Sequence, residues 1–197
     1  MQHHYFAIYK PFMMLCQFTQ ENEGDLTLAD LSFNFPKDCY SVGRLDKDSE
    51  GLLLLTNDNF LKTRFLSPKF HHSKTYYAQV EGIPTDEAIG QLQEGIDIKI
   101  KGKTHQTAPA KIERIAPPTL PERNPPIRYR ANIPTTWLSI TITEGKNRQV
   151  RRMCAAVGFP VLRLVRFGLE NLTLEDIQLT ALNKIEQKEI YKLLNTV

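Results

Sequence analysis

The sequence lacks any apolar run that approaches the roughly 20 residues needed to span a membrane. Its apolar runs, such as Leu52–Leu55, are only a few residues long. The N-terminal Met1–His4 is not a basic segment followed by an apolar core, so no secretory signal is expected. We therefore predict a cytoplasmic protein with no membrane partner.

Cysteine is scarce, and its spacing matches no zinc or redox motif. The three cysteines, Cys16, Cys39 and Cys154, are separated by 23 and 115 residues. We expect all three to be buried free thiols. The histidines include two adjacent pairs, which are poor chelates because neighbouring side chains of a strand face opposite ways. No metal site and no cofactor are predicted.

The sequence also lacks internal repeats and low-complexity tracts. Apolar residues make up 41% and charged residues 24% of the 197 residues, which is typical of an ordinary globular protein. The basic charge is concentrated in one part of the chain. Residues 101–174 hold 13 basic and 4 acidic side chains, whereas residues 1–100 hold 9 and 14. This distribution favours a binding site for a polyanion, although the acidic first half could compensate for the basic surface in space.

Local patterns predict strands and helices in alternation, hence a mixed α+β architecture. The predicted strands are Tyr5–Tyr9, Leu52–Thr56, Thr75–Val80 and Trp137–Thr143. A helix near Asn59–Leu66 is expected to be capped by Asn57 and Asp58, and a second helix to open at Thr85–Glu87 and end at Gly95. Residues 109–134 carry seven of the twelve prolines and are expected to form an ordered excursion or loop.

A third helix is predicted between Gly145 and Gly158, with Asn147 as its cap. Its apolar stripe consists of Val150, Met153, Cys154 and Val157. Arg148, Arg151 and Arg152 follow helical spacing on the opposite side. Three arginines without an acidic partner on the helix repel one another. A solvated face is possible, but recognition of phosphate or carboxylate groups is favoured.

A polar, glycine-bracketed loop, Gly43-Arg44-Leu45-Asp46-Lys47-Asp48-Ser49-Glu50-Gly51, lies between two apolar stretches. By composition alone, Asp46 and Asp48 would be turn formers or caps. With the following Leu52–Thr56, however, the loop resembles the catalytic signature of the rRNA pseudouridine synthases of the RsuA/RluB/E/F type. Lys74-Thr75-Tyr76 and Glu144–Met153 resemble two further motifs of this family, in the expected order.

Within this family the sequence is most similar to the E-type enzymes of the large ribosomal subunit, through Gln17–Thr19, Arg123–Arg128 and Ile133–Leu138. The resemblance implies a pseudouridine synthase fold, in which helices and loops flank a mixed, mostly antiparallel sheet. It implies a single catalytic domain over residues 1–197, made of about two α/β subdomains with the active-site cleft between them. Most relatives carry an N-terminal S4-type RNA-binding domain, which is not expected here because the first strand starts at Tyr5.

The family chemistry cuts the N1–C1′ bond of a uridine, rotates the base and rejoins it through C5, and it requires no cofactor. The resemblance implies that Asp46 is the essential carboxylate. It attacks C1′, attacks C6 or removes the 2′ proton, and the sequence does not choose among these roles. Arg151 is the expected partner of Asp46, and Tyr76 is expected to stack on the target base and to serve as the base that takes the C5 proton.

The RNA contacts are assigned to basic side chains around these motifs. The candidates are Arg44, Lys74, Lys146, Arg148 and Arg152, with Arg123, Arg128 and Arg130 of the proline-rich excursion. The implied substrate is one uridine of 23S rRNA near the peptidyl-transferase region, in free rRNA or in an assembling large ribosomal subunit. A monomer is expected. Two alternatives stay open, namely another rRNA uridine or a non-catalytic RNA-binding or ribosome-assembly factor.

Overall fold

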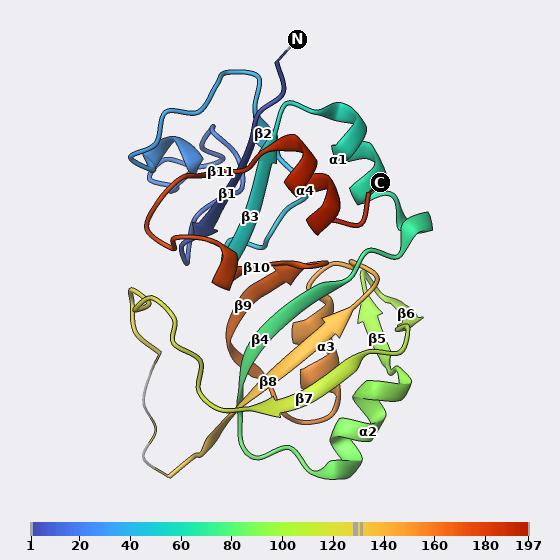
Figure 1. The fold of residues 1–197 in the computed structure, drawn as a ribbon. Helices are drawn as coiled ribbons and strands as arrows, with labels where there is room; N and C mark the ends of the chain where they lie inside the picture. The colour runs from blue at the N-terminus through green and yellow to red at the C-terminus, as the bar shows by residue number, and fades with distance from the viewer. Residues whose placement is uncertain (1, 128–129, 131, 197) are drawn as a thin grey trace. The chain divides into compact units, whose positions relative to one another are not determined.

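The computed structural model describes residues 2–127, 130 and 132–196, and the chain divides into two compact units. Unit 1 consists of residues 1–72 and 166–197, and unit 2 consists of residues 73–165. The strand β9 (Val161–Leu169) begins in unit 2 and ends in unit 1. Unit 2 is thus an insertion between two segments of unit 1 (Figure 1).

Unit 1 is built on antiparallel strands. Besides the end of β9, its strands are β1 (Tyr5–Lys10), β2 (Tyr40–Ser41), β3 (Glu50–Thr56), β10 (Leu172–Thr173) and β11 (Asn183–Lys184). The strand β1 lies between β11 and β3, while β2 pairs with β3 and β10 with β9. A small core on this sheet includes Phe6, Ile8 and Leu53.

The helices of unit 1 are short. They are α1 (Asn59–Leu66), α4 (Gln187–Leu193) and the 3-10 turns η1 (Leu28–Asp30), η2 (Pro68–Phe70) and η3 (Leu174–Asp176). The predicted helix 59–66 is confirmed, and its N-cap is the buried Asp58. One carboxylate oxygen of Asp58 accepts from the Phe60 and Leu61 amides, and the other accepts from the hydroxyls of Tyr5 and Tyr191 at 2.7 Å.

Unit 2 packs two helices against an antiparallel sheet with the order β4–β8–β7. Its elements are β4 (Lys74–Glu81), α2 (Asp86–Glu94), β5 (Asp97–Ile100), β6 (Lys103–Gln106), β7 (Lys111–Ile115), β8 (Thr135–Ile142) and α3 (Gln149–Ala156). The hairpin β5–β6 forms a separate two-stranded sheet. As predicted, the helix α2 starts behind the Thr85 cap and ends at Gly95.

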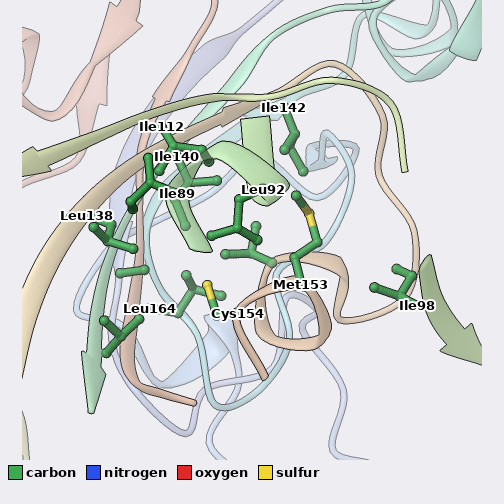
Figure 2. Packing of buried hydrophobic residues seen from close by; sticks show 13 residues of the cluster. Ile89, Leu92, Ile98, Ile112, Leu138, Ile140, Ile142, Met153, Cys154 and Leu164 are labelled. Carbon is green, nitrogen blue, oxygen red and sulfur yellow. The ribbon is translucent and has the colours of Figure 1, made fainter. Parts of the chain in front are cut away.

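The core of unit 2 joins its sheet to both helices. Figure 2 shows Leu92 of α2 and Met153 and Cys154 of α3 packed among the isoleucines and Leu138 of the sheet. The predicted apolar stripe of α3 is confirmed, because Val150, Met153 and Cys154 are buried in this core and Val157 packs against it.

The start of α3 differs from the prediction. The helix begins at Gln149 and not near Gly145, and Asn147 is not its cap. Arg148 precedes the helix in the left-handed conformation, with φ at 51°, and no side chain caps the helix start. The predicted arginine face therefore contains only Arg151 and Arg152, because a left-handed residue takes the Arg148 side chain off the helical repeat.

The expected α+β class with a mostly antiparallel sheet is confirmed by these pairings within the units. The short strands β2, β5, β6, β10 and β11, the helix α4 and the long strand β9 were not predicted. Residues 109–134 were expected to form an ordered excursion or loop, but Lys111–Ile115 form the strand β7, which pairs with β8. All three cysteines are free, and Cys39 and Cys154 are buried, but Cys16 is only half-buried, contrary to the expectation. None of the helices in the described residues is long and apolar enough to cross a bilayer.

Gly51 of β3 has no room for a side chain. Its φ is 109°, and a Cβ atom built there would lie 2.4 Å from the carbonyl oxygen of Arg166 in β9. Arg166 is itself fixed, because it is 3% exposed and its Nε donates to the Leu52 carbonyl at 2.8 Å. The glycine thus allows the backbone that follows the Asp46 loop to approach β9 closely.

We expect Gly51→Ala to lower the free energy of unfolding by about 3 kcal/mol or more, because neither the left-handed φ nor the two backbones can adjust cheaply. Urea denaturation measures this loss. The matched control is Gly90→Ala in α2, where nothing lies within 4 Å of the added Cβ. The control should be stabilised by about 0.5–1 kcal/mol through its helix propensity. Equal effects of the two changes would contradict the steric argument.

Candidate active site

The loop that carries Asp46 connects β2 to β3 in unit 1. Leu45 is buried, Asp46 is half-buried and Arg44 is exposed. The Ser49 amide donates to the Asp46 carbonyl at 3.0 Å and closes a turn directly after the aspartate. The burial of Leu45 anchors the loop and leaves its polar neighbours at the surface.

A buried lysine, Lys10, restrains this loop through hydrogen bonds. Lys10, the last residue of β1, is 0% exposed. Its ammonium group donates to the carbonyls of Pro11 and Met14 at 2.8 Å, and to that of Lys47 at 3.4 Å. Burial lowers the pKa of Lys10 to about 8. One side chain thereby connects the end of β1 to the residue that follows Asp46.

Three further contacts restrain the loop and the strand before it. The Leu45 amide donates to the sulfur of Cys16 at 3.2 Å, and the Ser41 hydroxyl donates to the Cys16 carbonyl at 3.0 Å. Lys47 forms an ion pair with Asp25. The backbone on both sides of Asp46 is therefore restrained by residues from the segment that follows β1.

The other two proposed catalytic residues belong to unit 2. Tyr76 lies in β4 opposite Ile140, and its half-buried ring packs against the core of that unit. Arg151 lies in the first turn of α3, and its Nη1 donates to the carbonyl of Val161 at 3.2 Å. Asp46 lies in unit 1, so its pairing with Arg151 stays a prediction.

Glu144 organises the segment between β8 and α3. Its Oε1 accepts from the Ala108 amide at 3.0 Å and from the Gln149 side-chain amide at 2.7 Å, and its Oε2 lies 3.1 Å from Nε2 of His105. Gln149 in turn accepts from the Lys146 amide at 3.0 Å. Burial alone would raise the pKa of Glu144, but the hydrogen bonds from Ala108 and His105 outweigh it and lower the pKa.

This network surrounds three of the residues assigned to RNA. Lys146 is exposed, and Arg148 is half-buried in its left-handed conformation. Arg152 donates to the backbone and side-chain oxygens of Asn147 and, at 2.6 Å, to the carbonyl of Lys99. Arg152 thus ties α3 to the loop before it and to β5, and a phosphate would contact only the remaining N–H groups of this guanidinium.

The other basic candidates are spread over unit 2, apart from Arg44 in unit 1. Lys74 opens β4 opposite Ile142. Arg123 donates to the carbonyl of Leu162 at 3.1 Å, which fastens the proline-rich excursion to the start of β9. Arg130 is exposed and forms an ion pair with Glu81 at 3.1 Å. Arg128 lies outside the described residues.

In the described part of the chain, no three His, Cys, Asp or Glu side chains gather in an arrangement that could hold a metal ion. Sequence reasoning did not identify Lys10, Cys16 or Glu144 as residues that fix the site. Lys10 gave a usable signal, since it is a charge at the end of an otherwise apolar strand. Glu144 gave none, because its partners His105 and Ala108 are more than 30 residues away in the sequence.

Comparison with known proteins gives a family match and close relatives. A family model described as RNA pseudouridylate synthase matches residues 4–156. The ribosomal large subunit pseudouridine synthase E of Vibrio parahaemolyticus is 52% identical over 86% of this chain and 68% of its own length. The protein of the same name from Xanthomonas axonopodis pv. citri is 45% identical over 84% of this chain and 85% of its own length.

Solved structures agree with these relatives. A crystal structure of a pseudouridylate synthase superimposes with a TM-score of 0.76 at 30% sequence identity, over 98% of this chain and 74% of that chain. The human RNA pseudouridylate synthase domain-containing protein 1 has a TM-score of 0.59 at 16% identity, over 92% of this chain and 78% of that chain. At this identity the second structure shows a shared fold alone.

The Glu144 network predicts a pH-dependent stability. The folded state lowers the pKa of Glu144 from its ordinary 4.5, so the ionised carboxylate stabilises the fold above that value and loses this effect as the pH falls below it. We expect Glu144→Gln to cost about 1 kcal/mol near pH 7, and the difference from the wild type to shrink in acid. Urea denaturation between pH 3 and 7 measures this, with the exposed Glu122→Gln as control. A difference that grew in acid would contradict the assignment.

Proposed function

Because this chain belongs to the family of RNA pseudouridylate synthases, we propose that it isomerises a uridine of the 23S rRNA of the large ribosomal subunit to pseudouridine. The single observation that carries this proposal is the position of the three motifs, at 43–56, 74–76 and 144–153. All three lie inside the segment matched by the family model. The relatives named as large-subunit pseudouridine synthases E support the choice of rRNA.

The reaction requires a carboxylate close to the ribose of the target uridine, and we assign this role to Asp46. Attack on C1′, attack on C6 and removal of the 2′ proton all need the ionised carboxylate in a fixed position. The tether through Lys10 and the turn closed by Ser49 support the assignment, because they restrain the backbone around Asp46. Holding the reactive group in place lowers the entropic cost of reaching the transition state.

Two residues of unit 2 complete the proposed reaction centre. Tyr76 presents a half-buried ring from the strand β4, which suits stacking on a uracil and removal of the C5 proton by its hydroxyl. Arg151 is proposed to orient Asp46 and keep it ionised.

The substrate has to bring its base out of the stack, because the atoms that react are hidden in a helix. We assign phosphate contacts around the target to Arg44, Lys74, Lys146 and Arg148, and to the free N–H groups of Arg152. We further propose that residues 1–197 act as one catalytic domain, since the three catalytic residues are divided between the two units. The protein is proposed to act as a monomer in the cytoplasm, on free rRNA or on an assembling large subunit.

Replacing Asp46 tests the activity itself. Asp46→Asn keeps the size of the side chain and removes the charge, so we expect no detectable pseudouridine while RNA binding is largely retained. The measurement is pseudouridine mapping in large-subunit rRNA from cells with the wild type, the variant or no protein. Asp48→Asn, two residues on in the same loop, is the matched control and should modify the rRNA. Pseudouridine made by Asp46→Asn would refute the assignment, as would its absence with the wild type.

Arg151 and Arg148 should behave differently when each is replaced with glutamine. If Arg151 orients Asp46, Arg151→Gln lowers the single-turnover rate by roughly 100-fold with little change in RNA affinity. Arg148→Gln should instead reduce the log–log salt slope of binding by about 0.8, because one phosphate contact is lost. Rates and salt titrations of both variants check this. An Arg151→Gln variant that lost salt slope and kept its rate would make Arg151 a phosphate contact.

A further inference from the structure

Two exposed aromatic side chains lie on neighbouring segments of unit 1, Phe60 on α1 and Phe70 on η2. Phe60 is 62% exposed and Phe70 is 46% exposed. The helix α1 buries Leu61 and Phe65 against its unit and leaves Phe60 exposed, while Arg64, four residues after Phe60, is half-buried. Large exposed aromatic rings in a group are uncommon on a protein that meets only water.

Two pairs of flat groups stack here, one at each exposed ring. The ring of Tyr191 in α4 lies parallel to that of Phe60, at an interplanar angle of 5° and a centroid distance of 6.5 Å. The guanidinium of Arg64 lies over the ring of Phe70, 4.6 Å from its centroid. Figure 1 shows α1 and α4 side by side in this unit. The hydroxyl of Tyr191 donates to the buried Asp58, so the ring of Tyr191 that stacks on Phe60 is held in place before any ligand binds.

The same face carries only positive charge from its own segment. Residues 59–73 contain Lys62, Arg64 and Lys69 and no aspartate or glutamate, whereas residues 1–58 hold 4 basic and 9 acidic side chains. Within the described residues, none of these three cations takes part in a salt bridge. Basic side chains that form no salt bridge within the described residues are available to a polyanion.

We infer that the face of Phe60, Arg64 and Phe70 binds an unpaired segment of the substrate RNA away from the reacting uridine. Bases stack on the exposed rings, and Lys62 and Lys69 contact the phosphates between them. Aromatic planes interleaved with cations are the usual platform for single-stranded nucleic acid. A basic protein would be repelled by this face, and an acidic peptide would leave the rings unused. The inference rests on the proposed function only for the identity of the RNA.

Two substitutions of Phe70 distinguish stacking of a base on its ring from simple apolar contact. Phe70→Leu keeps an apolar side chain but removes the π face, and Phe70→Tyr keeps the face. With a 23S rRNA transcript as probe, we expect Phe70→Leu to bind roughly tenfold more weakly and Phe70→Tyr to bind within about twofold of the wild type. Equal binding by Phe70→Leu and the wild type, at equal melting temperatures, would overturn the inference.

The charges are tested in the same assay. Replacing Lys62 and Lys69 with glutamine should reduce the magnitude of the log–log salt slope by about 1.4, at about 0.7 per phosphate contact of a single strand. The matched control replaces Lys37 and Lys184, two exposed lysines elsewhere in unit 1, and should leave the slope unchanged. An unchanged slope in the Lys62 and Lys69 variant, or an equal loss in the control, would contradict a specific RNA surface.

Binding and modification are measured separately, so the two proposals fail separately. If the wild type makes no pseudouridine and Phe70→Leu still binds RNA more weakly than Phe70→Tyr, the proposed activity fails and the RNA surface stands. If the wild type modifies the rRNA and the Phe70 variants bind alike, the surface fails and the activity stands. Weaker capture of a ribosomal protein by Phe70→Leu, with RNA binding intact, would assign the face to a protein partner.

Discussion

The buried ammonium group of Lys10 is the constraint on which the proposed catalytic loop depends. An ammonium group that is fully removed from water needs hydrogen bonds to nearby dipoles, or it gives up its proton and becomes neutral. Here the compensation comes from the carbonyls of Pro11, Met14 and Lys47, which belong to two segments far apart in the sequence. Because the Lys10 ammonium group donates to all three carbonyls, it holds the turn after β1 close to the loop of Asp46. The lowered pKa of Lys10 reflects the free-energy cost of burying its charged form.

Unit 2 uses a carboxylate for the same purpose. Glu144 collects donors from Ala108, His105 and Gln149, and so connects the segments around β6, β8 and α3. The left-handed Arg148 lies inside this closed segment. In each unit one charged group, the buried Lys10 or the half-buried Glu144, joins distant segments through hydrogen bonds at a motif that contains a proposed catalytic group, Asp46 or Arg151.

The arginines of unit 2 show how much of a basic segment serves the fold itself. Arg123, Arg151, Arg152 and Arg163 each donate to a backbone carbonyl, so part of their hydrogen-bonding capacity is used before RNA is present. Lys62, Arg64 and Lys69 of unit 1 differ, since none of them forms a salt bridge with a carboxylate within the described residues. The charge distribution along the sequence thus locates a basic segment. It does not distinguish arginines that hydrogen-bond to the backbone of the fold from arginines that are available to a ligand.

The sequence by itself determined the elements whose signals are local. The helix α1 has Asp58 at its start and Pro68 beyond its end, and α2 has Thr85 and Gly95. The strand β4 is rich in β-branched and aromatic residues and is followed by Gly82, so neighbouring side chains suffice to define all three elements. By resemblance, the ordered motifs also led to the proposal of Asp46, Tyr76 and Arg151 as catalytic residues. Two-residue strands such as β2 and β11 exist only because a partner strand supplies their hydrogen bonds. Only the tertiary structure decided the start of α3, the tether through Lys10 and the Glu144 network, because each depends on contacts between distant segments that no local pattern records.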